Sequence, residues 1–118
     1  MANTFKTITK ADISNASSTP TTVYTVPSGA TCVVLGILCV NKVNASVKVT
    51  LLLESDTANT GGGTNANITL AKDILLPSGS SLEFMAGQKY IMQTTDVLKA
   101  YSDSSSSVDV SFNYMEIT

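Results

Sequence analysis

The apolar side chains of this chain recur in short segments that predict β-strands over most of its length. From Val47 to Leu53 every second residue is Val or Leu, and from Val108 to Tyr114 every second residue is Val, Phe or Tyr. Alternation of this kind places apolar side chains on one face of a strand and polar side chains on the other. Both segments are therefore predicted to be strands with one buried face and one wet face.

Eight segments of this type are separated by turn signals. They are Thr21–Val26, Thr31–Asn41, Ser46–Glu54, Asn67–Leu76, Ser81–Met85, Lys89–Gln93, Val97–Tyr101 and Val108–Ile117. Two of the turns share the sequence Pro-Ser-Gly, at 27–29 and 77–79, where Pro fixes φ at the first corner and Gly accepts a positive φ. With no helical period, we expect an all-β domain over residues 21–118, a single jelly-roll-like β-sandwich of about eight short antiparallel strands.

The first 20 residues differ in pattern from the rest. Their large apolar side chains after Met1 are Phe5, Ile8 and Ile13, which bury too little surface to offset the ordering of the segment. We therefore expect residues 1–20 to form an N-terminal arm or edge strand that a neighbouring molecule orders.

Two features predict apolar surface that a single copy leaves uncovered. The segment Thr31–Asn41 is apolar at both parities, and Met115 and Ile117 fall on the polar parity of Asp109. Either a bulge turns Met115 and Ile117 inward, or they form an apolar edge that a partner covers. We expect a homo-oligomer, with a trimer as the first candidate.

The composition disfavours several classes of function. The chain has no histidine, arginine or tryptophan, whereas serine and threonine occupy 31 of its 118 positions. Histidine is the side chain that titrates nearest neutral pH, and arginine is the usual bidentate clamp for phosphate and carboxylate. The seven lysines are dispersed and the formal net charge is −2, so no basic stripe is available for a nucleic-acid backbone. We expect a non-enzymatic structural or binding protein that does not bind nucleic acid.

The acidic residues and the glycines offer no convincing site. Gly61-Gly62-Gly63 is not followed by the Gly-Lys-Ser/Thr of a phosphate-binding loop. Glu54 with Asp56, and Asp103 with Asp109, lack the ligand density of a calcium site. No metal and no cofactor is therefore predicted.

The two cysteines, Cys32 and Cys39, fall in the most apolar segment, where thiol pKa values rise. Seven residues along a strand separate them by about 23 Å, at ~3.3 Å per residue, and place them on opposite faces. We expect inert core thiols and no disulfide between them.

Two turn motifs carry a resemblance to a known group. Thr-Val-Tyr-Thr-Val-Pro-Ser-Gly at 22–29 opens the domain, and Leu-Glu-Phe-Met-Ala-Gly-Gln at 82–88 precedes the last strands. Over residues 21–117 this arrangement resembles the small β-sandwich virion proteins of tailed bacteriophages. Gln88 stands where an Asp often follows the Gly in that group.

The resemblance implies a capsid decoration, or cement, protein whose partners are further copies of itself and the major capsid protein. The alternatives are a tail, neck or fibre-base component of the virion and, in another class, a glycan-binding module that uses Tyr24, Tyr90, Tyr101 and Tyr114 as a stacking platform. The candidate assembly contacts are Phe5, Ile8, Ile13, Tyr24, Met115 and Ile117.

The expected location is the virion, after synthesis in the host cytoplasm without secretion. The first residues lack the apolar stretch of a secretory signal. The longest apolar run, Ala30–Val40, is about half of the ~20 residues that a membrane helix needs. We therefore expect no membrane association, and unpaired cysteines fit a reducing compartment.

Overall fold

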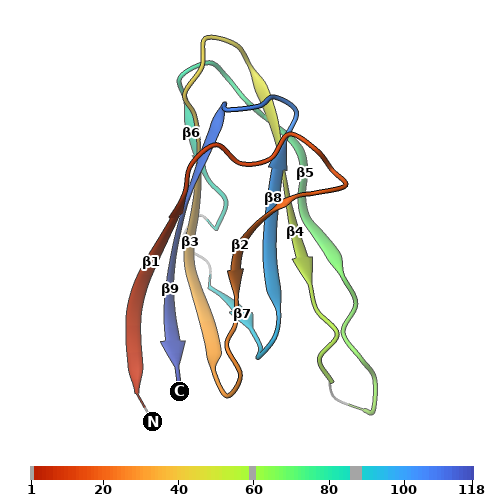
Figure 1. Cartoon of the computed structure of the whole chain (residues 1–118). Helices are drawn as coiled ribbons and strands as arrows, with labels where there is room; N and C mark the ends of the chain where they lie inside the picture. Colours follow the sequence, from red (N-terminus) through yellow and green to blue (C-terminus); the bar gives the residue numbers. More distant parts are fainter. Residues whose placement is uncertain (1, 59–60, 86–88) are drawn as a thin grey trace.

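The computed structural model describes residues 2–58, 61–85 and 89–118. Within these ranges the chain forms two antiparallel sheets and no helix (Figure 1). The strands are β1 (Asn3–Lys10), β2 (Thr21–Thr25), β3 (Thr31–Asn41), β4 (Val47–Glu54), β5 (Ile68–Leu76), β6 (Ser81–Glu83), β7 (Tyr90–Met92), β8 (Val97–Ser102) and β9 (Val108–Ile117).

The strand order is that of a jelly roll. One sheet runs β1-β9-β3, with β6 and β7 both pairing along the far edge of β3, and the other runs β2-β8-β4-β5. The first strand thus pairs with the last, the second with the eighth, and the fourth with the fifth, as in a folded antiparallel ribbon. Figure 1 shows the two termini side by side at one end, where the Ala2 N–H donates to the Thr118 carbonyl oxygen over 3.1 Å. The predicted all-β sandwich is confirmed.

Residues at the N-terminus form the edge strand of the first sheet. Strand β1 pairs with β9 over its whole length, from Asn3 opposite Ile117 to Lys10 opposite Val110. An arm or an edge strand was expected for residues 1–20, and residues 3–10 form an edge strand. Ordering of the segment by a neighbouring molecule stays a prediction.

The core between the sheets centres on three aromatic rings. The ring centroids of Tyr24 and Tyr114 lie 4.4 Å apart, and those of Phe112 and Tyr114 lie 5.0 Å apart. Phe112 is fully buried, and aliphatic side chains such as Leu51 and Leu98 surround the group. Tilted and stacked aromatic pairs at these distances contribute beyond the area that they bury.

A β-bulge in β3 corrects the prediction for the cysteines. The register of β3 against β9 shifts between Val34 and Gly36, and an extra residue reverses the parity of every side chain beyond it. Cys32 and Cys39 therefore both point into the core, with 0% exposure, and not to opposite faces. Both are free thiols, and burial raises the pKa of each to about 12.

Glu83 is the last residue of β6 and lies beside the bulge in β3. One carboxylate oxygen, Oε1, accepts the Ile37 N–H over 2.7 Å and the Met85 N–H over 3.0 Å. A Cβ atom at Gly36 would lie 3.1 Å from the other oxygen, Oε2. The chain thus closes the gap in the ladder with a side chain, and Gly36 makes room for it.

Both Pro-Ser-Gly turns have the predicted form. The φ angles of Gly29 and Gly79 are 79° and 67°. The Ala30 N–H donates to the Pro27 carbonyl oxygen over 3.2 Å, and the Ser80 N–H donates to that of Pro77 over 3.1 Å. In the second motif of the phage resemblance, residues 86–88 lie outside the described part of the chain.

Candidate assembly surface

A row of four apolar side chains crosses the outer face of the first sheet. The register places Phe5 opposite Met115, Met115 opposite Val33, and Val33 opposite Ile91. Residues paired in this way project from the same face of a sheet. Phe5 and Ile91 end the row on the two edge strands, with 72% and 54% exposure, and the two middle residues are partly exposed.

Ile117 extends this row toward the chain termini, since it lies between Asn3 and Thr31 on the same face. We call the five residues Phe5, Val33, Ile91, Met115 and Ile117 the apolar face. The five side chains themselves are uncharged, and beside them Thr7 donates its hydroxyl to the Asn113 side-chain oxygen over 2.7 Å. The Glu83 carboxylate lies farther along the same face, beside Gly36.

The alternation of β9 explains why Met115 and Ile117 lie outside. No register shift interrupts the pairing of β9 with β1, so the residue between them, Glu116, points inward. Of the two alternatives left open by the sequence, an inward-turning bulge is wrong, because both side chains lie partly exposed on the outer face of β9. Coverage of these residues by a partner stays a prediction.

Glu116 ties three strands together behind the apolar face. Its carboxylate accepts a hydrogen bond from the Lys6 ammonium over 3.1 Å and one from the Tyr24 hydroxyl over 2.9 Å. The Lys6 ammonium, followed by the Tyr24 hydroxyl, holds the pKa of Glu116 below its ordinary value. Burial and the same hydrogen bond raise the pKa of Tyr24, so its hydroxyl remains a donor.

The six candidate contact residues therefore separate into two groups. Phe5, Met115 and Ile117 lie together on the apolar face. Ile8 is partly buried and packs against the core. Ile13 is 1% exposed and Tyr24 is buried, so both are core residues that the surface does not present.

Sequence reasoning missed two members of the apolar face. Val33 was one of many apolar residues in Thr31–Asn41, and the bulge that separates the inward from the outward ones left no signal in the alternation. Ile91 lies on a strand of three residues, too short for its parity to be read. Only the pairing of β7 with β3 identifies it.

Charged side chains gather at the other end of this sheet. Lys42 pairs with Asp12 and with Asp109, its Nζ lying 2.9 Å from the Asp109 carboxylate. The Asp12 backbone N–H, together with Lys42, lowers the pKa of Asp109.

In residues 2–58, 61–85 and 89–118 no group of histidine, cysteine or acidic residues could hold a metal ion. The same ranges contain no helix long and apolar enough to cross a membrane.

Comparison with known proteins identifies the fold. No family model and no curated protein matches the sequence. Among solved structures, the chain is similar to that of infectious bursal disease virus strain Gx, at 12% identity, 97% coverage of this chain, 32% of that chain and a TM-score of 0.53. It is also similar to the T=1 particles derived from that virus, at 10% identity, 97% and 31% coverage and a TM-score of 0.52.

A third solved structure, the VP2 subviral particle of the same virus, is 14% identical, with 97% and 32% coverage and a TM-score of 0.50. The chain spans about a third of the length of these solved chains. At such identities the likeness concerns the fold and not the activity. These structures come from infectious bursal disease virus and not from a tailed bacteriophage. The chain therefore has a β-sandwich fold that is shared with part of a viral capsid protein.

Proposed function

We propose that this protein is a non-enzymatic virion structural protein that assembles with further copies of itself through the apolar face. The observation that carries this proposal is the exposed row from Phe5 to Ile91. It crosses the outside of a sandwich whose fold occurs in a viral capsid protein. Exposed apolar rows of this kind mark interaction sites, since they gain from removal from water.

A second copy of this chain is the occupant that the apolar face favours. A partner surface must itself be uncharged, because burying an unpaired charge against the row would cost several kcal/mol. The apolar face meets that condition. Its two most exposed residues, Phe5 and Ile91, stand at opposite ends, so contact of Phe5 with the neighbour's Ile91 is head-to-tail. A head-to-tail contact closes into a ring when the rotation between copies allows it, and we propose a trimer.

The finer role that we propose is decoration of a capsid shell, as the phage resemblance implies. With no arginine and seven dispersed lysines, attachment depends on apolar and hydroxyl contacts, which salt does not screen. Binding to undecorated capsids is expected to survive molar salt in a co-sedimentation series. Release at moderate salt, or binding only to tails, would favour another virion role.

The assembly proposal is tested by sedimentation velocity at high micromolar concentration. We expect the wild type to sediment as a trimer of the 12.3 kDa chain and Phe5→Asp to sediment as a monomer. Leu75→Asp is the matched control, since Leu75 is also an exposed apolar residue (56%) but lies on β5 of the other sheet. A wild type that is monomeric at every concentration, or equal loss of assembly in both variants, contradicts the proposal.

A further inference from the structure

A pocket of about 320 Å³ opens between the two sheets, on the side away from β1 and β2. Strand β7 lines it from the first sheet, and β4 and β5 line it from the second. Ser55, Asn65 and Ala66 between β4 and β5, and Gln93 and Asp96 after β7, complete its lining. Its volume lies at the small end of the range for ligand sites in proteins.

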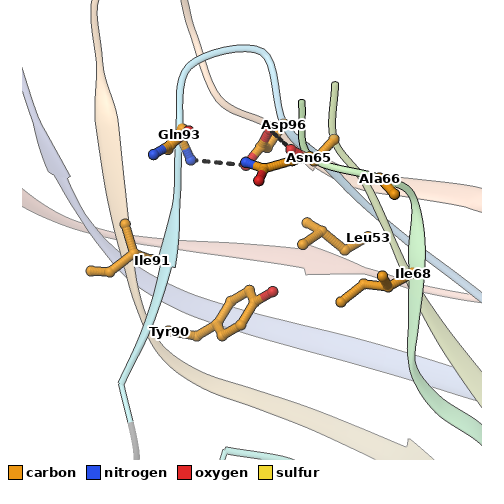
Figure 2. Close-up of a pocket in the computed structure, with 9 residues that line it drawn as sticks. Leu53, Asn65, Ala66, Ile68, Tyr90, Ile91, Gln93 and Asp96 are labelled. Carbon is orange, nitrogen blue, oxygen red and sulfur yellow. Dashed lines mark hydrogen bonds between the residues drawn. The ribbon is translucent and has the colours of Figure 1, made fainter. Parts of the chain in front are cut away.

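The pocket has one polar side and one apolar side. Figure 2 shows Asp96 and Asn65 along one side, where the Gln93 backbone N–H donates to Asp96, with Tyr90, Leu53 and Ile68 on the other side. In the same view Ile91 projects from the opposite side of β7, in agreement with its position on the apolar face. A ligand in this pocket therefore meets hydrogen-bonding groups on one side and hydrocarbon on the other.

Asp96 is the most constrained polar group of the pocket. It is 3% exposed. One carboxylate oxygen accepts the Ser55 hydroxyl over 2.6 Å, and the other accepts the Gln93 backbone N–H over 2.9 Å. Each carboxylate oxygen has two acceptor sites, and these bonds fill one on each. In the part of the chain that the structure describes, no lysine lies within ion-pair distance of Asp96.

Tyr90 supplies an aromatic ring and a hydroxyl at the boundary between the two sides. Burial, together with the charge of Asp96, raises the pKa of Tyr90, so the hydroxyl keeps its proton at neutral pH. The ring is partly exposed and points toward Leu53 and Ile68 (Figure 2). Aromatic side chains with a wet polar end suit ligands that have both an apolar and a polar part.

We propose that this pocket binds a neutral saccharide unit. A pyranose ring has C–H bonds on its faces and hydroxyl groups around its rim, which matches an apolar wall opposite a rigid carboxylate, with the Tyr90 hydroxyl at the boundary. Its hydroxyls donate to Asp96 and exchange both kinds of hydrogen bond with the Tyr90 hydroxyl. The site and the apolar face share Ile91, but Tyr90 and Asp96 are not part of the apolar face, so variants at these two positions test the site separately from the assembly.

Two other ligand classes fit the pocket less well. An anion would meet the Asp96 carboxylate, the one formal charge among the residues that line the pocket, and would be repelled by it. An alkylammonium ion would satisfy Asp96, but it has only donors and offers no acceptor to the Tyr90 hydroxyl hydrogen. A hydroxyl group both donates and accepts, so a ligand with several hydroxyl groups satisfies the Asp96 carboxylate and the Tyr90 hydroxyl.

The saccharide site differs from the stacking platform expected from the sequence. That platform combined four tyrosines, but Tyr24 and Tyr114 lie in the core because they face inward on β2 and β9. Tyr101 lies on β8 and does not line the pocket. Of the four, Tyr90 alone lines it.

The test is a titration of the ¹⁵N-labelled full chain with the methyl glycosides of glucose, galactose, mannose and N-acetylglucosamine, followed by amide chemical shifts. We expect shifts confined to residues that line the pocket, with a dissociation constant on the order of 1 mM for a ligand of about a dozen heavy atoms. Asp96→Asn and Tyr90→Phe should each weaken binding about tenfold. If Asp96→Asn fails to fold, Tyr90→Phe and Ile68→Ala still test the site.

Two matched controls lie elsewhere on the molecule. Asp73→Asn and Tyr101→Phe change the same residue types outside the pocket and should leave the titration unaltered. The proposal is overturned if no glycoside shifts the pocket amides or if Tyr90→Phe binds like the wild type. It is also overturned if methylammonium chloride produces the same shifts at lower concentration, which would assign the pocket to a cation.

Discussion

The effect of Gly36→Ala on the free energy of unfolding is expected to change sign when Glu83 is replaced by alanine. Gly36 has no positive φ, so its backbone tolerates alanine, and removing a strand glycine gains about 0.5–1 kcal/mol. The added Cβ, however, lies 3.1 Å and 3.3 Å from the two carboxylate oxygens of Glu83. That carboxylate is fixed by two backbone N–H groups, the nearer one at 2.7 Å.

Displacing the Glu83 carboxylate weakens both hydrogen bonds, at a cost of about 1.5–2 kcal/mol for partly exposed groups. The net effect of Gly36→Ala is therefore a destabilisation of about 1 kcal/mol. In a Glu83→Ala background the conflict is absent, and Gly36→Ala should stabilise the protein by about 0.5 kcal/mol. The coupling between the two sites is then about 1.5 kcal/mol.

Urea unfolding of the four proteins of this cycle, followed by far-ultraviolet circular dichroism, measures the coupling. A free-energy change for Gly36→Ala that is the same in the wild type and in the Glu83→Ala background would refute the reasoning. It would show that the carboxylate moves aside without loss and that Glu83 does not support the bulge.

Three further predictions concern the edge strand and the core. The pKa of Glu116 is lowered from 4.5 by Lys6 and Tyr24, so its contribution to stability is complete above pH 4.5 and is lost as the pH falls through the lower value of the folded state. Urea midpoints of wild type and Glu116→Gln should therefore converge in acid, and a difference that persists at the lowest pH would contradict this. Cys32 and Cys39, buried and with pKa values of about 12, should react with Ellman's reagent only after denaturation; prompt labelling of the folded protein would show that the core opens. Deleting residues 2–10 removes β1 but keeps Ile13 in the core. The truncated chain should therefore remain folded, as measured by circular dichroism, but lose self-assembly. Unfolding of this chain would show that the sandwich requires β1.

The proposed surface and pocket depend on pairings that are distant in the sequence. Phe5 and Met115 lie side by side through the pairing of the first strand with the last. In the pocket, Leu53, Ile68 and Tyr90 come from three strands. Alternation within a strand reports which side chains share a face, but it carries no information on which strand lies alongside. The sequence thus supplied three members of the apolar face and none of its geometry.

Features that depend on near neighbours in the chain could be predicted from the amino-acid sequence alone. The strand segments follow from alternation, and the reversals at 27–29 and 77–79 follow from the φ preferences of Pro and Gly. The outward position of Met115 was left open because alternation alone does not exclude a bulge. The bulge between Val34 and Gly36, which turns Cys39 inward, and the burial of Ile13 and Tyr24 follow only from the tertiary structure. These depend on how two sheets fit against each other, because a shift of one residue in register moves every later side chain to the other face.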